Sequence, residues 1–171
     1  MDSIIRNLNE EDFHEYYRIR LKSLEENPVA YSSMPKFFRE CPKEKHLSLL
    51  KDSGGNSRFF VKGYFEENCL LGIIVMLPES RECVDHKASM WGDVDSNYQG
   101  RGIGTRLLSS FLDDARAEKC LEVSVLWLLL HVSAIHLFKK FGFEEYGREH
   151  ESIRDLDNKY YDQLYLQIPC I

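Results

Sequence analysis

The stretch Val94-Asp95-Ser96-Asn97-Tyr98-Gln99-Gly100-Arg101-Gly102-Ile103-Gly104-Thr105-Arg106-Leu107-Leu108 is the most informative part of this chain. It opens on the last apolar residue of a predicted strand and closes in the first turns of an amphipathic helix. Behind the glycines, apolar side chains recur at the spacing of one helix face; they are Ile103, Leu107, Leu108, Phe111, Leu112 and Ala115. The stretch therefore predicts a strand, a tight turn and a helix in succession.

The turn itself, residues 99–105, is called the glycine loop below. Its glycines Gly100, Gly102 and Gly104 stand at alternate positions, so one edge of the turn carries no side chains and a ligand can touch bare backbone. The first N–H groups of the following helix have no internal partner and lie at the positive end of its dipole. Arg101 and Arg106 add positive charge. This pattern predicts a phosphate-binding loop, with a purely structural turn as the alternative.

The loop lacks the Gly-Lys-Ser/Thr of a Walker loop, and a G-x-G-x-x-G reading would place its third glycine on Thr105 or Leu107. It fits Q/R-x-x-G-x-G/A, and in this setting it resembles the pyrophosphate loop of the GNAT superfamily of acyl-CoA-dependent N-acyltransferases. The resemblance implies acetyl-CoA as cosubstrate, without a metal. The cofactor-binding residues that it implies are Val94, Gln99, Gly100, Arg101, Gly102, Ile103, Gly104, Thr105, His131, Ser133 and Phe138.

The resemblance covers nearly the whole chain and is strongest over residues 86–143. Residues 24–33 resemble the family's L-x-x-x-P-x-A-F/Y-x-S stretch, which implies that Tyr31 lines the acceptor site; a core position is the alternative. Residues 131–143 resemble N-x-x-A-I-x-L-Y-x-x-x-G-F. The pair Tyr161-Asp162 lies where the final strand of the family often carries such a pair.

Two positions depart from the family pattern. His131 stands where Asn is usual, and it is either a cofactor contact or an ordinary residue at a helix start. Phe138 stands where a Tyr often protonates the departing thiolate, and a Phe has no proton to give. Because a thiol has a pKa near about 8.5, the thiolate is a tolerable leaving group near neutral pH. Water or another hydroxyl could also supply the proton.

Acyl transfer needs an oxyanion donor and a base. The family pattern implies that the backbone N–H of Val94 donates to the developing oxyanion. Asp93 is the nearest carboxylate on the same strand and is the first candidate for the general base; the alternative is a solvated strand residue. Asp95 is expected to be a turn residue or a cap.

With 171 residues, 43% of them hydrophobic and 29% charged, the chain is expected to form a single domain over residues 1–171. No apolar run approaches the roughly 20 residues that span a bilayer. The N-terminus lacks the apolar core of a signal peptide, so a cytoplasmic location is expected. The five cysteines show no C-x-x-C spacing and are expected to be reduced.

The formal charge, 22 minus 28 or −6, argues against nucleic acid as a general partner. Neither a membrane nor a metal is expected, since His86 and His136 have no partner at metal-ligand spacing. The expected acceptor is a small-molecule amine or a peptide amine, and a homodimer is left open. Local basic groups must then attract the anionic cofactor.

The element pattern predicts a mixed α/β fold of order β-α-α-β-β-β-α-β-α-β-β, which is also the order of the GNAT fold. Such an order favours a central sheet, part antiparallel and part parallel, with helices on both faces. Strands are predicted at residues 4–6, 58–65, 69–77, 86–94, 121–128, 143–150 and 160–168, and helices at residues 11–26, 43–51, from 103 onward and at 132–141. Residues 29–37 and 78–85 are expected to be loops.

Taken together, these patterns predict an N-acetyltransferase that moves an acetyl group from acetyl-CoA to a primary amine by direct attack in a ternary complex. The alternatives are a CoA-binding regulatory or sensor module without catalysis, and a nucleotide-binding switch. The missing P-loop lysine argues against the switch. The sequence does not choose among a metabolite amine, an amino acid, an aminoglycoside-like drug and a protein amine as acceptor.

Overall fold

A computed structural model describes residues 3–31, 33–53, 58–120, 122–128 and 132–170. The strands are β1 Ser3–Asn7, β2 Phe60–Glu66, β3 Cys69–Pro78, β4 Lys87–Val94, β5 Glu122–Leu128, β6 Glu144–Arg154 and β7 Tyr160–Pro169. The helices are α1 Phe13–Glu26, α2 Pro35–Glu40, α3 Lys43–Asp52, α4 Ile103–Ala117 and α5 Val132–Lys140. Short 3-10 turns include η1 Glu10–Asp12, η2 Pro28–Tyr31 and η4 Ser96–Tyr98.

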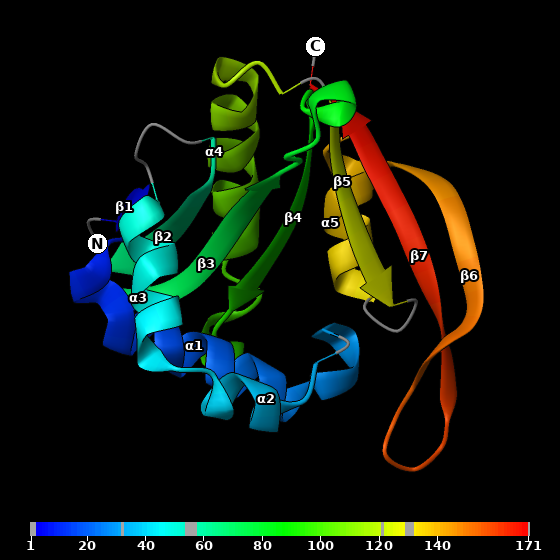
Figure 1. Ribbon diagram of the computed structural model, residues 1–171, viewed down its shortest axis with the longest axis horizontal. Coiled ribbons are helices and arrows are strands. Elements are labelled where there is room, and N and C mark those ends of the chain that lie inside the picture. Colours follow the sequence, from blue (N-terminus) through cyan, green and yellow to red (C-terminus); the bar gives the residue numbers. More distant parts are fainter. Residues whose placement is uncertain (1–2, 32, 54–57, 121, 129–131, 171) are drawn as a thin grey trace.

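The strands form one sheet in the order β1-β2-β3-β4-β5-β7-β6. Every neighbouring pair is antiparallel except β4 and β5, which run parallel. The parallel ladder joins only Lys87–Ser89 to Glu122–Ser124. Beyond it the two strands diverge toward their C-terminal ends, as Figure 1 shows. The predicted mixed sheet is therefore confirmed. Its strands β4 and β5 separate beyond Ser89 and Ser124.

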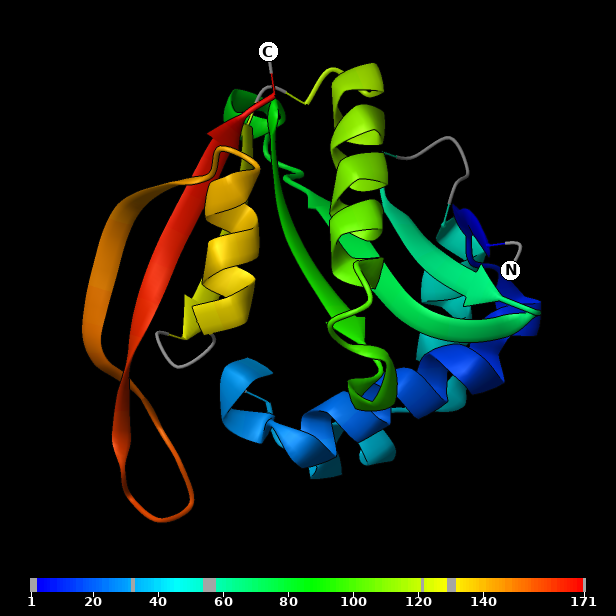
Figure 2. The same ribbon diagram turned by 180° about the vertical axis from the view of Figure 1, so that it is seen from behind.

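Helices cover both faces of the sheet. Helices α1, α2 and α3 lie on the face turned to the viewer in Figure 1, whereas α4 and α5 lie on the opposite face, which Figure 2 brings to the front. Each face has its own core. Phe111 and Leu108 of α4 are fully buried against one side of the sheet, and Ile19 of α1 and Leu50 of α3 against the other.

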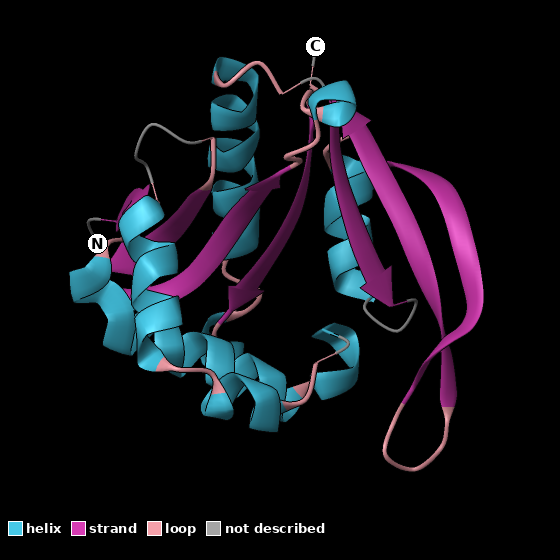
Figure 3. Ribbon diagram, in the orientation of Figure 1, coloured by secondary structure: helices cyan, strands magenta, loops and turns pink. Residues whose placement is uncertain are grey.

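The last two strands form a long hairpin at the edge of the molecule. Figure 3 shows β6 and β7 forming one edge of the sheet and extending past the end of β5. Strand β6 continues to Arg154, beyond the predicted end at residue 150. Its outward side chains are mostly exposed, and only β7 pairs with it among the described residues.

Most predicted elements are confirmed within a few residues, and Gly142 follows α5 with a φ of +92°, as a residue after a helix often does. The prediction of a loop over residues 29–37 was wrong, because this segment contains η2 and the start of α2. Pro35 occupies the first turn of α2, where a missing N–H costs nothing. Phe38 of α2 then packs on Tyr17, with 5.0 Å between ring centroids.

No helix in the described parts of the chain is long and apolar enough to span a membrane.

Candidate active site

A cavity of about 630 Å³ lies along the open edge of β4, where β5 has turned away. Its walls come from β4, η2, the glycine loop, the first turns of α4, and α5. Most of the residues proposed from the sequence line it: Tyr31, Asp93, Val94, Gln99, Gly100, Gly102, Ile103, Gly104, Thr105, Ser133 and Phe138. The fold thus gathers these residues from three separate segments of the chain around one space.

The glycine loop has the backbone geometry of an open helix start. Gly100 and Gly102 adopt φ values of +76° and +79°, in the left-handed region that favours glycine. Gly102 is the N-cap of α4, and the N–H of Arg106 is the first to bond back, to the oxygen of Gly102 at 3.1 Å. No side chain caps this helix. The N–H groups of residues 103–105 are therefore available to a ligand.

The glycines of the loop have different surroundings. A Cβ on Gly102 would meet no atom within 4 Å, so open space lies in front of its backbone. A Cβ on Gly104 would lie 3.3 Å from Cδ2 of Leu137 in α5. Gly104 therefore lets α4 and α5 approach each other, whereas Gly102 leaves room for a ligand.

The two arginines of the loop region have partners within the protein. Arg101 forms an ion pair with Glu66 at 2.7 Å, and Arg106 donates to the hydroxyl of Tyr64 at 3.0 Å. Neither of them lines the cavity, whereas Lys140 at the end of α5 does. A contact between Arg101 and a cofactor stays a prediction.

The backbone of Val94 faces the cavity. The N–H of Asp95 donates to the oxygen of Leu71 in β3 at 2.9 Å. Because successive N–H groups of a strand point to opposite edges, the N–H of Val94 points away from β3, toward the open edge. The parallel ladder with β5 ended at Ser89, so β5 does not take this donor. A backbone donor therefore lies where the sequence resemblance implies an oxyanion donor.

Asp93 is fully buried, so its interpretation as a solvated strand residue was wrong. Nη1 of Arg20 in α1 donates to its Oδ2 at 3.0 Å. The Arg20 guanidinium contacts two rings, with its Cζ 4.1 Å from the centroid of Trp91 and 4.4 Å from that of Tyr31. Burial raises the pKa of Asp93 above its usual range, against the opposing charge of Arg20. The carboxyl group is thus tuned towards accepting a proton.

Tyr31 ends η2 and lines the cavity beside Asp93. Burial, and next the nearby carboxylate of Asp93, raise the pKa of Tyr31 far above its usual value, so it stays a neutral phenol. Within the described residues, Oδ1 of Asp93 has no hydrogen bond of standard geometry, although the hydroxyls of Tyr31 and Ser23 are near enough to affect its titration. This oxygen is buried beside the cavity wall that Tyr31 and Asp93 form.

The C-terminal wall comes from α5. Ser133 lies in its first turn and Phe138 in its second half, and both line the cavity. Phe138 is also part of the core, because it is 4% exposed and its ring packs edge-on against Phe143 at 5.1 Å. His131 lies outside the described residues. Among those that are described, no group of three or more His, Cys, Asp or Glu side chains could hold a metal ion.

Sequence reasoning missed the contribution of α1. Arg20, Ser23 and Asn27 follow one another at three and four residues, so they share one helix face. Arg20 and Ser23 face Asp93, and Asn27 lines the cavity. The spacing of these polar residues on one face of α1 was the signal that could have found them.

The family model described as Acetyltransferase (GNAT) family matches residues 9–143. The chain belongs to this family. The match spans α1, the glycine loop and α5, so it covers every element that lines the cavity. This GNAT protein is therefore an acyltransferase kind of enzyme. A search of curated proteins gives no match.

Solved structures of GNAT proteins share its fold over nearly their whole length. An N-acetyltransferase from Staphylococcus aureus Mu50 superposes with a TM-score of 0.87 at 16% identity, covering 100% of both chains. A ribosomal-protein-alanine N-acetyltransferase from Brucella melitensis gives 0.84 at 22% identity, covering 97% of this chain and 99% of the other. The yncA protein from Salmonella typhimurium, described with its cofactor acetyl-CoA, gives 0.83 at 16% identity, covering 99% and 94%. These likenesses establish the fold.

Proposed function

We propose that this GNAT protein transfers an acetyl group from acetyl-CoA to a primary amine, by direct attack of the amine in a ternary complex. The observation that carries the proposal is the cavity on the open edge of β4. It joins a helix start with free N–H groups to a buried carboxyl group, which are the two features that an anionic thioester and a cationic amine require.

In this proposal the pyrophosphate of acetyl-CoA lies on the glycine loop. The N–H groups of residues 103–105 donate to it, and the open space before Gly102 allows the close approach. The description of yncA with acetyl-CoA supports the choice of cosubstrate. The thioester then lies along β4, with its carbonyl oxygen accepting from the N–H of Val94.

The acceptor binds as an ammonium ion next to Asp93. The buried carboxylate of Asp93 accepts its proton, directly or through water, and the neutral nitrogen attacks the carbonyl carbon. The carbon–sulfur bond breaks and the thiolate leaves, while the nitrogen loses its second proton to water and so becomes the neutral amide. Arg20 keeps Asp93 in place and favours its charged form before the amine arrives.

Phe138 cannot protonate the departing thiolate, so water is the proposed source of that proton. A thiolate is a tolerable leaving group near neutral pH, because the thiol pKa is about 8.5. Phe138 instead forms an apolar wall of the cavity and excludes water from the far side of the thioester.

The experiment that tests the function is a turnover assay with acetyl-CoA and a panel of amines. The panel holds a polyamine, free amino acids, an aminoglycoside, phosphinothricin and peptides with free N-termini or lysines. We expect free CoA to be released with at least one class, with acetylation of its amine nitrogen verified by mass spectrometry. CoA binding without release for every amine would contradict the proposal and favour a sensor module.

A further inference from the structure

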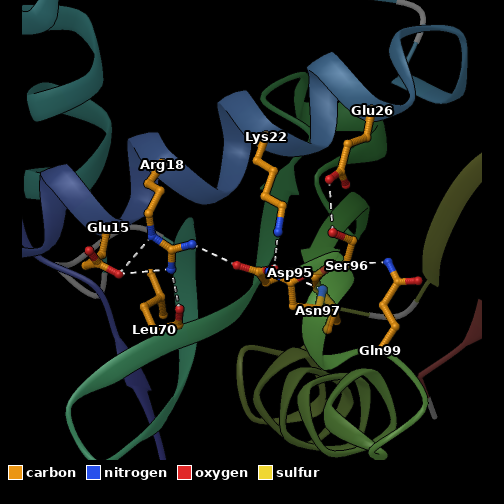
Figure 4. A network of polar contacts seen from close by, with 10 residues as sticks. Glu15, Arg18, Lys22, Glu26, Leu70, Asp95, Ser96, Asn97 and Gln99 are labelled. Carbon is orange, nitrogen blue, oxygen red and sulfur yellow. Dashed lines mark hydrogen bonds and ion pairs between the residues drawn. The ribbon is translucent and has the colours of Figure 1, made fainter.

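Asp95 is a buried carboxylate at the junction of β4 and the segment that leads into the glycine loop. It is 4% exposed, and two cations of α1 reach it across the end of the sheet, as Figure 4 shows. Nη1 of Arg18 donates to its Oδ2 at 2.7 Å, and Nζ of Lys22 donates to its Oδ1 at 2.5 Å. The carboxylate is thus held from one side by a helix 73 and 77 positions earlier in the chain.

The same carboxylate also organises the chain that follows it. Its Oδ1 accepts from the N–H of Asn97 at 3.1 Å and so caps η4, the turn before the glycine loop. Its backbone oxygen accepts from the N–H of Tyr98 at 2.8 Å. Nε2 of Gln99 then donates back to the oxygen of Val94 at 3.2 Å. These bonds fix the path from β4 to the start of the loop.

The contacts on α1 come from one stripe of that helix. Arg18, Lys22 and Glu26 are four residues apart and project toward the same place in Figure 4. Glu26 accepts from the hydroxyl of Ser96 at 3.0 Å. Arg18 donates as well to the oxygen of Leu70 in β3 at 2.8 Å. One face of α1 therefore forms hydrogen bonds with both the start of β3 and the residues that follow β4.

The charges at this junction are balanced in favour of an ionised Asp95. Burial by itself would raise the pKa of Asp95, but the hydrogen bonds from Lys22 and Arg18 outweigh it and hold that pKa below its usual range. The carboxylate remains charged at neutral pH and keeps all three of its hydrogen bonds.

We propose that Asp95 is a positioning residue for the cofactor site: by joining α1 to η4 it holds Gly102 and the first N–H groups of α4 where they receive the CoA pyrophosphate. The inference rests on the proposed function, since it assumes CoA on the glycine loop. It adds that α1, which contributes no N–H group to that loop, determines the affinity for CoA through Asp95.

A positioning role and a purely electrostatic role of Asp95 predict opposite changes in CoA affinity when its charge is removed. Asp95 is a negative charge near the site proposed for a polyanion, so its removal should tighten CoA binding if charge alone mattered. If Asp95 positions the loop, its removal should weaken binding, because a displacement of about 1 Å can cost 100-fold.

The test is Asp95→Asn in the full chain, with CoA affinity measured by calorimetry and initial rates measured with acetyl-CoA. We expect the Kd for CoA and the KM for acetyl-CoA to rise roughly 10- to 100-fold. At saturating acetyl-CoA, kcat should change much less, since Asp95 touches no reacting atom. Equal or tighter CoA binding by a folded Asp95→Asn protein would overturn the inference.

Asp12→Asn is the matched control. Asp12 likewise holds an arginine, Arg6, through two hydrogen bonds of 2.7 and 2.8 Å, and accepts from the N–H of Asn9. It lies at the other end of α1 and does not line the cavity. This variant should lose stability but keep its CoA affinity. An equal loss of affinity in both variants would reduce the role of Asp95 to general stability and overturn the inference.

If Asp95→Asn does not fold, Lys22→Met replaces it, measured in about 1 M salt, where exposed charges are screened. A loss of CoA affinity that persists there supports positioning, whereas a loss that disappears reflects charge alone and contradicts it. Wild-type protein that binds no CoA would overturn the proposed function itself, and the inference with it. Failure of the inference alone leaves wild-type binding intact.

Discussion

At the scale of single residues, three consecutive positions at the end of β4, Asp93, Val94 and Asp95, have different surroundings. Side chains alternate along a strand, so Asp93 and Asp95 both face α1, where Arg20 in one case and Arg18 and Lys22 in the other pair with them. Val94 faces the opposite side, where its Cγ2 would lie 3.9 Å from a Cβ on Gly104. The alternation of side chains along β4 thus places Asp93, the proposed proton acceptor, on the opposite face of the sheet from the side chain of Val94.

Gly102→Ala should weaken CoA binding strongly. Its φ of +79° makes any side chain costly by about 1 kcal/mol, and the new Cβ would occupy the open space before the backbone. Gly142→Ala is the control, because Gly142 has a φ of +92° and does not line the cavity. Thermal unfolding should show a similar fall in Tm for both variants. Calorimetry should show a loss of CoA affinity for Gly102→Ala alone. Unchanged affinity in Gly102→Ala would contradict a role of this glycine in ligand approach.

Asp93→Asn should reduce turnover roughly 10²–10⁴-fold while the KM for acetyl-CoA stays nearly constant. The loss should shrink as pH rises, because free amine then becomes available without a base. A loss that is the same at every pH would identify Asp93 as a structural partner of Arg20 instead.

The companion variant is Arg20→Gln, which keeps the carboxyl group and removes the charge that lowers its pKa. The acidic limb of its pH–rate profile should move to higher pH, because the base is then harder to deprotonate. An unmoved limb would argue against Asp93 as the titrating group.

At the scale of elements, α3 attaches to α1 and α2 through a buried histidine. His46 is surrounded by the rings of Phe13, Tyr16, Tyr17 and Phe38, with centroid distances of 4.6 to 6.3 Å. Within the described residues, its Nε2 has no hydrogen-bond partner. Burial lowers the pKa of His46 from its ordinary value of 6.5, so the neutral ring belongs to the folded state.

Stability should therefore fall in mild acid. The unfolded chain takes up a proton on this histidine more readily than the folded protein does, so the contribution of His46 is complete above about pH 6.5 and is lost as pH falls below it. His46→Leu should show a smaller drop in Tm between pH 7.5 and pH 5 than wild type. The exposed His14, substituted in the same way, should leave that drop unchanged. An identical drop in all three proteins would contradict this role of His46.

The elements that the sequence predicted well carry local signals. The glycine loop, the β2–β3 hairpin and the stripe of α4 can each be read within about 15 residues, because turn chemistry and periodicity are local. The pair of Arg20 and Asp93 joins residues 73 positions apart, and only the packing of α1 across the end of β4 makes it. The turn η2 and helix α2 were missed because they are too short for periodicity to show.

At the scale of the whole molecule, the sheet consists of two antiparallel sections joined by the short ladder between β4 and β5. The proposed ligand lies along the gap and touches α4 from one section and α5 from the other. Ligand binding should therefore stabilise the connection between the two sections, where the ladder between β4 and β5 is short.

CoA at 100 times its Kd should raise Tm by roughly 5–10 °C, which corresponds to about 2.7 kcal/mol of linkage in a chain of this size. Hydrogen exchange should slow most at residues 90–94 of β4 and in the first turn of α4. ATP is the control, and it should give a much smaller shift because it lacks the pantetheine arm. An equal shift with ATP would favour a nucleotide site and contradict the GNAT use of the loop.

The gap in the sheet also has a consequence for synthesis, because the two walls of the cavity come from sections of the chain that are made one after the other. A ribosome makes and releases β1 to α4, and with them the complete glycine loop, before it releases β5 or α5. The strands of the first section are neighbours in sequence and pair antiparallel, so its sheet contacts need no residue of the second section. The second wall of the cavity arrives last. During synthesis, acetyl-CoA bound as proposed would therefore act only on the final docking of the C-terminal section, and we expect the nascent chain to be inactive until β5 to β7 are in place.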